Sequence, residues 1–386
     1  MGYGFGQLQA TAELARRGTR LHPAQNRNWL VLSSALAHLG DLHAAAECLR
    51  EALTVLPPSA ELHRQLAELL ASQDLWEEAL VHAERTLSIA PDDRDARRLR
   101  FEALAVLGAR EDHDLDAVGA FAAESPRLLA QRARSLGPAA TVELCDVMLA
   151  EKPGHCMATY LKAVALARLG CMEEARRMIS LDRLIETRQL AVPPGYADER
   201  SFGDALAAEI RANPTLGADP RAKATRGGLQ TRSLRQPGAV AIEALLARFR
   251  QAVDAYEERL LAAGNEFALI RPRRARLRAW AVIYGANGRQ KSHMHPAGWL
   301  SGVYYVSAPR RNGENAYRGP LVLGALEPGQ RVAAPPWGTS EVEPVPGRLV
   351  LFPSYVPHAT LPSGISGERI SVAFDVIEAA QPAALH

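Results

Sequence analysis

Prolines recur at a fixed interval in the first half of the chain. Pro23, Pro57 and Pro91 are separated by two steps of 34 residues. A period between about 20 and 50 residues is typical of arrays in which one supersecondary unit stacks on the next. This feature constrains the fold strongly, because each unit exposes an apolar face that only a neighbouring unit can bury.

Two adjacent segments, starting at Asn26 and Ala60, match each other in phase. They place mostly apolar or small residues and a final proline at equivalent positions: Trp29, Leu32, Leu36, Gly40, Leu42, Ala45, Leu49, Ala52 and Pro57 in the first segment, and His63, Leu66, Leu70, Asp74, Trp76, Ala79, Ala83, Thr86 and Pro91 in the second. Small residues let two helices approach closely, and the proline ends the second helix. Over residues 26–93 this pattern resembles the tetratricopeptide repeat, which implies helix–turn–helix units.

We predict helical repeats over residues 1–180, with less regular units before and after the two clear ones. A stacked array of this kind presents a concave groove, so we expect it to bind a peptide or protein partner. The alternative is that the array supports or dimerises the second domain, which leaves a homodimer open.

Bulk properties argue against several classes of function. The 386 residues exceed what one core usually serves, so two domains are expected. The net charge of +2 predicts no large field that would attract nucleic acid or an anionic membrane surface. No apolar run reaches the roughly 18 residues of a membrane span. The cysteines have no paired spacing, which predicts a reduced, cytoplasmic protein; they are Cys48, Cys145, Cys156 and Cys171.

The second half of the chain changes from helical to strand-like patterns. Residues 181–238 are predicted to connect two domains, and residues 239–263 have the period of a helix that packs outside a sheet. From Leu277 onward, short strand patterns alternate with glycine and proline turns, and Gly285–Gly288 is predicted to be one such turn. Short strands of this kind predict a jelly roll or barrel, so the expected fold class is α+β multidomain.

Three histidines and an arginine follow in an order that suits a metal site. His293 and His295 alternate along a strand or strand end and so point to the same side. His358 lies 63 residues after His295, and Arg369 lies 11 residues after His358. Imidazole nitrogen binds iron(II) readily, and the planar fork of arginine binds a carboxylate bidentately. Ser371 faces the same way as Arg369. The pattern predicts a metal held by imidazoles beside a cationic anchor.

Residues 277–377 resemble the iron(II)- and 2-oxoglutarate-dependent oxygenases, which fold as a double-stranded β-helix. Three segments carry the resemblance: Tyr284–His295, Val345–Pro353 and Arg369–Ser371. The resemblance implies an oxygenase domain over residues 239–386 that uses Fe(II), 2-oxoglutarate and O₂. It further implies hydroxylation of a peptide or protein recruited by the repeats, with oxidative decarboxylation of 2-oxoglutarate to succinate.

The same resemblance implies roles for individual residues. Metal ligands are expected at His293, His295 and His358. Contacts to 2-oxoglutarate are expected from Arg369, Ser371, Tyr284 and Tyr305. Trp299 follows the first metal motif and is expected to line the substrate entrance.

One position departs from the family pattern, because residue 295 is histidine where the superfamily usually has aspartate or glutamate. Three neutral ligands leave the site one negative charge short. His295 is then a ligand, or an acidic residue arrives from elsewhere, or water completes the site. Two other functions stay open: a three-histidine iron dioxygenase that does not use 2-oxoglutarate, and a non-catalytic repeat adaptor with a degenerate barrel.

Overall fold

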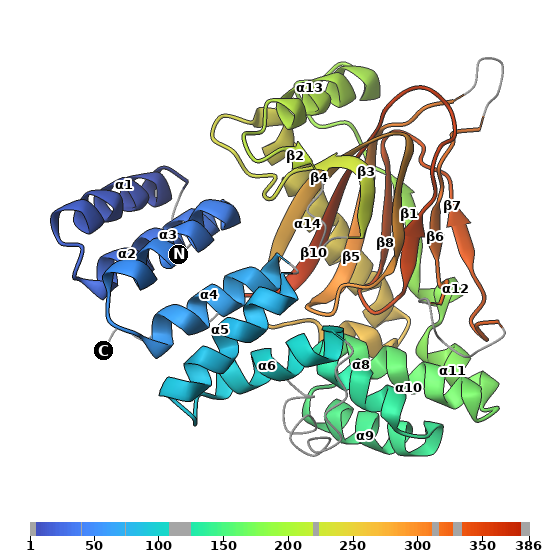
Figure 1. The fold of residues 1–386 in the computed structure, drawn as a ribbon. Coiled ribbons are helices and arrows are strands. Elements are labelled where there is room, and N and C mark those ends of the chain that lie inside the picture. The colour runs from blue at the N-terminus through green and yellow to red at the C-terminus, as the bar shows by residue number, and fades with distance from the viewer. Residues whose placement is uncertain are drawn as a thin grey trace. The chain divides into compact units, whose positions relative to one another are not determined.

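The computed structural model describes residues 5–39, 41–73, 75–107, 125–218, 224–310, 316–326 and 334–379 (Figure 1). These residues fall into two compact units. The first unit runs to Ser135, and the second begins at Leu136.

The first unit is a row of helices in which each helix packs on the next along the chain. The helices are α1 (Phe5–Leu21), α2 (Asn26–His38), α3 (Leu42–Val55), α4 (Ala60–Ser72), α5 (Trp76–Ile89), α6 (Arg94–Leu107) and α8 (Pro126–Ser135). The small residues of the repeat lie between them, and Ala45, Ala52 and Ala83 have no exposed surface. Asp41 and Ser59 accept hydrogen bonds from the first turns of α3 and α4, as helix N-caps do. The prediction of helix–turn–helix repeats is confirmed; Gly40 and Asp74 lie outside the described residues.

The second unit begins with further helices and includes a long one that covers a sheet. Its helices are α9 (Pro138–Glu151), α10 (Cys156–Arg168), α11 (Met172–Met178), α12 (Leu181–Leu184), α13 (Glu199–Arg211), α14 (Val240–Ala262) and the short 3₁₀ helix η1 (Glu266–Ile270). The helices α9, α10 and α11 thus belong to the same compact unit as the sheet. The end of the repeat array at residue 180 stays a prediction, as do the domain boundaries at residues 181 and 239.

Ten strands within the described residues form one antiparallel, curled sheet of jelly-roll type. They are β1 (Glu186–Gln189), β2 (Gly217–Ala218), β3 (Thr225–Gln230), β4 (Ala275–His293), β5 (Gly298–Ser307), β6 (Leu321–Leu323), β7 (Ser340–Val342), β8 (Arg348–Pro353), β9 (His358–Thr360) and β10 (Arg369–Glu378). The order is β1-β8-β5-β10-β4-β9-β6-β7, and β3 pairs with both β2 and β4. The predicted fold class is confirmed, and the segment predicted as a connector supplies β1, β2, β3 and α13.

The turn predicted at Gly285–Gly288 is wrong, because β4 runs unbroken through these residues. The first part of β4 pairs with β10, and its last part pairs with β9. A Cβ atom at residue 288 would lie 2.7 Å from Cβ of Tyr284 and 3.0 Å from the Gly227 oxygen. Glycine at this position therefore lets the strand coil closely against itself and β3, and it bends the sheet without reversing the chain.

Helix α14 covers one face of the sheet and leaves the other face for the site. Phe249 of α14 stacks on Phe374 of β10, with ring centroids 4.4 Å apart. Side chains alternate along a strand, so the odd-numbered residues of β10 point to the opposite face. Arg369, Ser371 and Asp375 therefore share the face that points away from α14.

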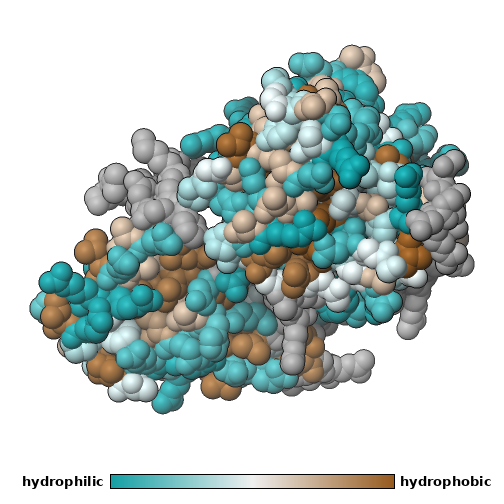
Figure 2. All heavy atoms as spheres, turned by 90° about the horizontal axis from the view of Figure 1, so that it is seen from above, coloured by the Kyte–Doolittle hydropathy of each residue, from teal (hydrophilic) through white to brown (hydrophobic). Residues whose placement is uncertain are grey.

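Polar residues predominate on the surface in the view of Figure 2, and hydrophobic residues appear there in smaller groups between them. Among the described helices, none combines the length and the apolar character needed to cross a membrane.

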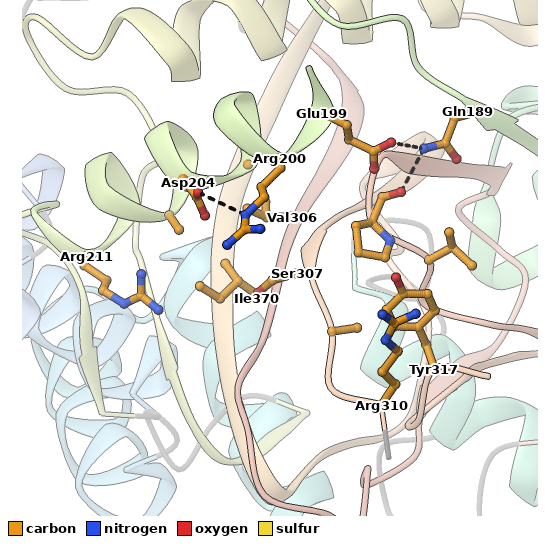
Figure 3. Close-up of a pocket in the computed structure, with 15 residues that line it drawn as sticks. Gln189, Glu199, Arg200, Asp204, Arg211, Val306, Ser307, Arg310, Tyr317 and Ile370 are labelled. Carbon is orange, nitrogen blue, oxygen red and sulfur yellow. Dashed lines mark hydrogen bonds and ion pairs between the residues drawn. The ribbon is translucent and has the colours of Figure 1, made fainter. Parts of the chain in front are cut away.

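A charged groove lies beside α13, away from the three histidines. It has a volume of about 630 Å³ and lies between α13, the end of β5 and Val345–Pro346 (Figure 3). Two of its polar pairs join lining residues: Arg200 lies 4.0 Å from Asp204, and the amide of Gln189 donates to Glu199 at 2.9 Å. These pairs are typical of a solvated surface groove, and we assign no chemistry to it.

Candidate metal centre and cosubstrate pocket

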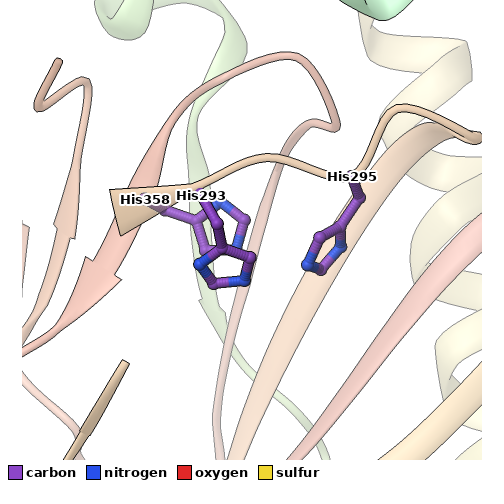
Figure 4. Close-up of side chains that lie close together, drawn as sticks. All are labelled: His293, His295 and His358. Carbon is purple, nitrogen blue, oxygen red and sulfur yellow. The ribbon is translucent and has the colours of Figure 1, made fainter. Parts of the chain in front are cut away.

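The structure brings His293, His295 and His358 together at one end of the sheet. One ligand nitrogen from each ring lies within 4.8 Å of the other two. His293 is directly opposite His358 in the β4–β9 pair, and their ring centroids are 4.3 Å apart. The ring of His295 lies 5.1 Å from that of His293 and 4.9 Å from that of His358. Figure 4 shows the three rings gathered beside the end of the strand.

The hydrogen bonds of His293 and His358 fix which nitrogen carries a proton. Nδ1 of His293 is 2.8 Å from the Lys291 carbonyl oxygen, and Nδ1 of His358 is 3.1 Å from the Val356 carbonyl oxygen. A carbonyl only accepts, so Nδ1 is the donor in both rings, and Nε2 carries the lone pair when the ring is neutral. The two main-chain carbonyls therefore hold His293 and His358 in the form that can bind a metal through Nε2.

Both of these rings are held in the neutral state. Burial, reinforced by the charge of His295, lowers the pKa of His293 to about 4. Burial and the neighbouring histidines hold the pKa of His358 well below its ordinary value. Neutral imidazole is the metal-binding form, so at neutral pH these two histidines do not need to lose a proton before they bind an ion.

His295 differs from the other two histidines because its Nδ1 contacts a carboxylate. Nδ1 is 2.5 Å from Oδ1 of Asp375 and 3.2 Å from the Ser301 hydroxyl. Asp375 is fully buried, and its second oxygen accepts from Arg278 at 2.7 Å. Burial opposes ionisation of Asp375, but His295 and Arg278 outweigh this effect and lower the pKa of the carboxyl. The acid that the sequence lacks at position 295 thus lies behind the ring.

Arg369 is a buried cation with an incomplete set of partners. Its side chain is 2% exposed, and Nη1 and Nη2 donate to the carbonyls of Gly319, Leu361 and Gly288. Nε is buried without a hydrogen-bond partner, and in the described part of the chain no carboxylate pairs with the guanidinium. A Cβ atom at residue 319 would lie 1.9 Å from Nη1, so glycine there makes room for the arginine.

The remaining residues predicted to contact 2-oxoglutarate surround this cation. Tyr284 lies directly opposite Arg369 in the β4–β10 pair, and Tyr305 is opposite Ser371 in the β5–β10 pair. All three neighbours are buried, and burial raises the pKa of the Tyr305 hydroxyl. Arg369 is thus a single positive charge among buried side chains that carry hydroxyl groups. Its role in binding a cosubstrate stays a proposal.

A cavity of about 330 Å³ opens beside His293 and His295. Its walls come from β3, β4 and the segment before and after β3: Ala224, Thr225, Gln230, Arg232, Arg278, Trp280, Gln290, His293 and His295. The ring of Trp280 lies 5.5 Å from that of His295. Trp299, which the sequence analysis placed at the entrance, is 4% exposed, stacks on Phe267 and donates its indole proton to the Phe267 carbonyl. The structure thus places Trp280, and not Trp299, at this cavity.

Four residues near the histidines were not predicted from the sequence: Asp375, Ser301, Arg278 and Trp280. One signal for Asp375 was present: it is an acid in an apolar strand, at even spacing from Arg369 and Ser371, so it had to share their face. Arg278 and Trp280 face the site because of the β4–β10 register, which no local pattern reveals.

Comparisons with known protein families agree with both halves of this description. Residues 278–375 match the family described as "Putative 2OG-Fe(II) oxygenase", and residues 26–69 match the tetratricopeptide repeat. The comparison with curated proteins gives no match.

Several solved structures are similar to parts of the chain. A prolyl-4-hydroxylase from Pseudomonas putida is 23% identical over 51% of this chain and 93% of its own, with a TM-score of 0.37. A prolyl hydroxylase from Trichoplax adhaerens, in complex with a hypoxia inducible factor peptide fragment, is 16% identical over 55% of this chain and 92% of its own, with a TM-score of 0.35. A tetratricopeptide repeat protein from Parabacteroides merdae is 18% identical over 45% of this chain and 71% of its own, with a TM-score of 0.37. On the two family matches, the chain joins a region that matches the tetratricopeptide repeat to a region that matches the family described as "Putative 2OG-Fe(II) oxygenase".

Proposed function

We propose that this protein is an iron(II)- and 2-oxoglutarate-dependent oxygenase that hydroxylates a peptide or protein recruited by its helical repeats. One observation carries the proposal. Three gathered imidazoles and a buried guanidinium whose counter-ion is absent from the described residues occur in the same sheet. The first feature suits a metal ion, and the second suits the far carboxylate of a dicarboxylic acid.

The donor set fits iron(II). His293, His295 and His358 would hold the ion through nitrogens that the main chain and Asp375 leave unprotonated, and three protein ligands leave room for small molecules. A bound iron would supply the activation of O₂, in which 2-oxoglutarate is oxidatively decarboxylated to succinate and CO₂ and one oxygen atom remains for hydroxylation. The residues of this chain hold the ligand nitrogens in place and keep their protons on the far side of each ring.

The buried cation fits 2-oxoglutarate. A guanidinium that is buried without a counter-ion carries a large desolvation cost, and a bound carboxylate offsets it. Arg369 would grip that carboxylate through the Nε that lacks a partner. Ser371, Tyr284 and Tyr305 would flank it and exclude water, which strengthens the ion pair.

The cavity beside His293 and His295 is the route we assign to the substrate. Trp280 forms part of its wall, and the exposed Arg232 lies at its rim. Recruitment through the repeats rests on their match to a repeat family and on the groove that such arrays present. All four cysteines are unpaired, three of them buried, which suits a reducing compartment such as the cytoplasm.

Two other functions account for less of the site. A three-histidine dioxygenase without 2-oxoglutarate would leave Arg369 buried and uncompensated. A non-catalytic adaptor would have no use for three histidines whose lone pairs converge.

Succinate formation tests the proposal. Protein purified without oxygen is given iron(II), 2-oxoglutarate, O₂ and cell-lysate peptides, and succinate is measured by chromatography. We expect turnover in the wild type and in His43→Ala, whose exposed histidine lies on α3, but not in His293→Ala or His358→Ala. A wild type that holds no iron and forms no succinate, coupled or uncoupled, would contradict the proposal.

A further inference from the structure

A closed ring of hydrogen bonds lies behind His295. Nδ1 of His295 contacts Asp375, and the Ser301 hydroxyl donates to the same carboxylate oxygen at 2.9 Å. The hydroxyls of Ser301 and Ser354 are 2.8 Å apart, and the Ser354 carbonyl accepts from the His295 main-chain nitrogen at 3.0 Å. The ring joins β5, β10 and the residues that follow β4 and β8, so it fixes His295 although this residue lies beyond the end of β4.

The protons in this ring can be arranged in one consistent way. An ionised carboxylate only accepts, so the nitrogen and the hydroxyl that contact Oδ1 of Asp375 must both donate. Ser301 has a single proton and gives it to Asp375, so the Ser354 hydroxyl donates to Ser301. His295 therefore has a proton on Nδ1, and when the ring is neutral its Nε2 carries the lone pair, as in the other two histidines.

We infer that Asp375 is the positioning residue of the metal centre. It holds His295 in the Nδ1–H form and supplies, through that ring, the negative charge that a third imidazole lacks as a ligand. The inference rests on the proposed function, because it assigns a role toward a metal that His293, His295 and His358 would bind. Carboxylates behind metal-bound histidines are a general device for orienting the ring and raising its basicity.

The geometry distinguishes this role from that of a direct ligand. Among the described residues, the group of close ligand atoms consists of the three histidines and does not include Asp375. Both oxygens of Asp375 are already engaged, one by His295 and Ser301 and the other by Arg278. The carboxylate thus acts from behind the ring, and its other oxygen forms an ion pair with Arg278.

Metal affinity measured without turnover tests the inference. Cobalt(II) binding to the full-length protein is followed by its visible absorption, for the wild type and Asp375→Asn. Asparagine keeps the size and one acceptor but loses the charge, so we expect cobalt affinity to fall about 10- to 100-fold. Affinity within twofold of the wild type would overturn the inference. If the wild type bound no cobalt, both this inference and the proposed function would fail.

The variant Arg278→Gln tests whether Asp375 acts through its negative charge or only by keeping the local structure in place. Arg278 is half exposed, and its loss leaves the carboxylate in contact with His295 and Ser301. Because the variant removes a positive charge that competes with the metal, we expect cobalt affinity at least equal to that of the wild type. A structural role predicts instead that Arg278→Gln and Asp375→Asn weaken binding alike, and that result would overturn the inference.

The protonation of His295 gives a readout that does not depend on metal. With ¹⁵N-labelled histidine, NMR of the apo-protein is expected to show His295 with its proton on Nδ1, and a mixture of the two forms in Asp375→Asn. His293 and His358 serve as internal controls, because main-chain carbonyls hold their protons. An unchanged His295 signal in the variant would show that Asp375 does not set the form of the ring.

Discussion

The guanidinium of Arg369 lies over the ring of Tyr284, with its central carbon 4.7 Å from the ring centroid. The two residues are directly opposite each other in β10 and β4, so the register of the sheet brings them together. The face of an aromatic ring attracts a cation but does not neutralise it. The second unit therefore contains a buried positive charge whose Nε has no hydrogen-bond partner and which no carboxylate of the described residues neutralises.

Arg369→Gln should abolish most of the thermal stabilisation that 2-oxoglutarate gives the protein. A charge-assisted hydrogen bond is worth about 1.5–3 kcal/mol, so we expect affinity for 2-oxoglutarate to fall roughly 10- to 100-fold. The measurement is the rise in Tm of the cobalt-loaded protein on addition of 2-oxoglutarate. Arg348→Gln is the matched control, since Arg348 lies in β8 and donates to the Glu343 carbonyl. Equal protection of Arg369→Gln and wild type would exclude Arg369 as the anchor.

Substitutions in the cavity beside the histidines should lower hydroxylation of the substrate without changing the turnover of 2-oxoglutarate. Trp280→Ala removes a wall of that cavity without removing a predicted ligand of metal or 2-oxoglutarate. We expect uncoupled succinate formation to stay within about twofold of the wild type, while hydroxylation of lysate peptides, followed by mass spectrometry, drops at least about tenfold. Trp299→Phe keeps the stacking on Phe267 and should leave both rates unchanged. The assignment of the entrance fails if Trp280→Ala hydroxylates peptides normally.

The parts of the fold that could be predicted from the sequence depend on local spacing. The repeat period follows from Pro57 and Pro91 because helix length and turn position repeat with them. His293 and His295 could be expected on the same side for a related reason, because alternate residues of an extended chain share a face, and their rings lie 5.1 Å apart.

The parts that could not be predicted depend on how distant strands align. Trp280 and Trp299 have similar surroundings in sequence, yet one lies at the cavity and the other packs on Phe267. Asp375 contacts His295 because β10 lies between β4 and β5 in one particular register. A shift of one residue would turn Asp375 to the α14 side of the sheet. Such registers are set by the whole core.

Gly302→Ala should destabilise the second unit. A Cβ atom at residue 302 would lie 2.4 Å from two ring atoms of Phe374, and that ring is stacked on Phe249 and cannot easily retreat. Overpacking of this kind costs about 1–3 kcal/mol, which urea unfolding followed by circular dichroism would detect. Gly137→Ala is the control, because a Cβ atom there meets nothing within 4 Å. If the two variants unfold at the same urea concentration, the ring of Phe374 can move aside without a measurable loss of stability, which would contradict the prediction.

The first unit, which contains the helical repeats, has its own pair of interacting histidines. His63 on α4 and His82 on α5 are stacked, and their Nδ1 atoms lie 2.9 Å apart. One nitrogen must donate and the other must accept, so at least one of the two rings is neutral. Burial, with the charges of His63 and Arg50, lowers the pKa of His82 to about 4, and burial also lowers the pKa of His63.

Acid should therefore destabilise the repeat unit through His82. The ordinary pKa of histidine is about 6.5, so between that pH and about 4 the unfolded chain binds more protons than the folded one. The contribution to stability is complete above pH 6.5 and is lost as the pH falls through this window. Thermal unfolding of full-length His82→Gln between pH 7 and pH 4.5 should show a smaller drop in Tm than the wild type, while His43→Gln, changed at an exposed histidine, should match the wild type. An identical pH dependence in all three proteins would show that the His63–His82 pair does not sense acid.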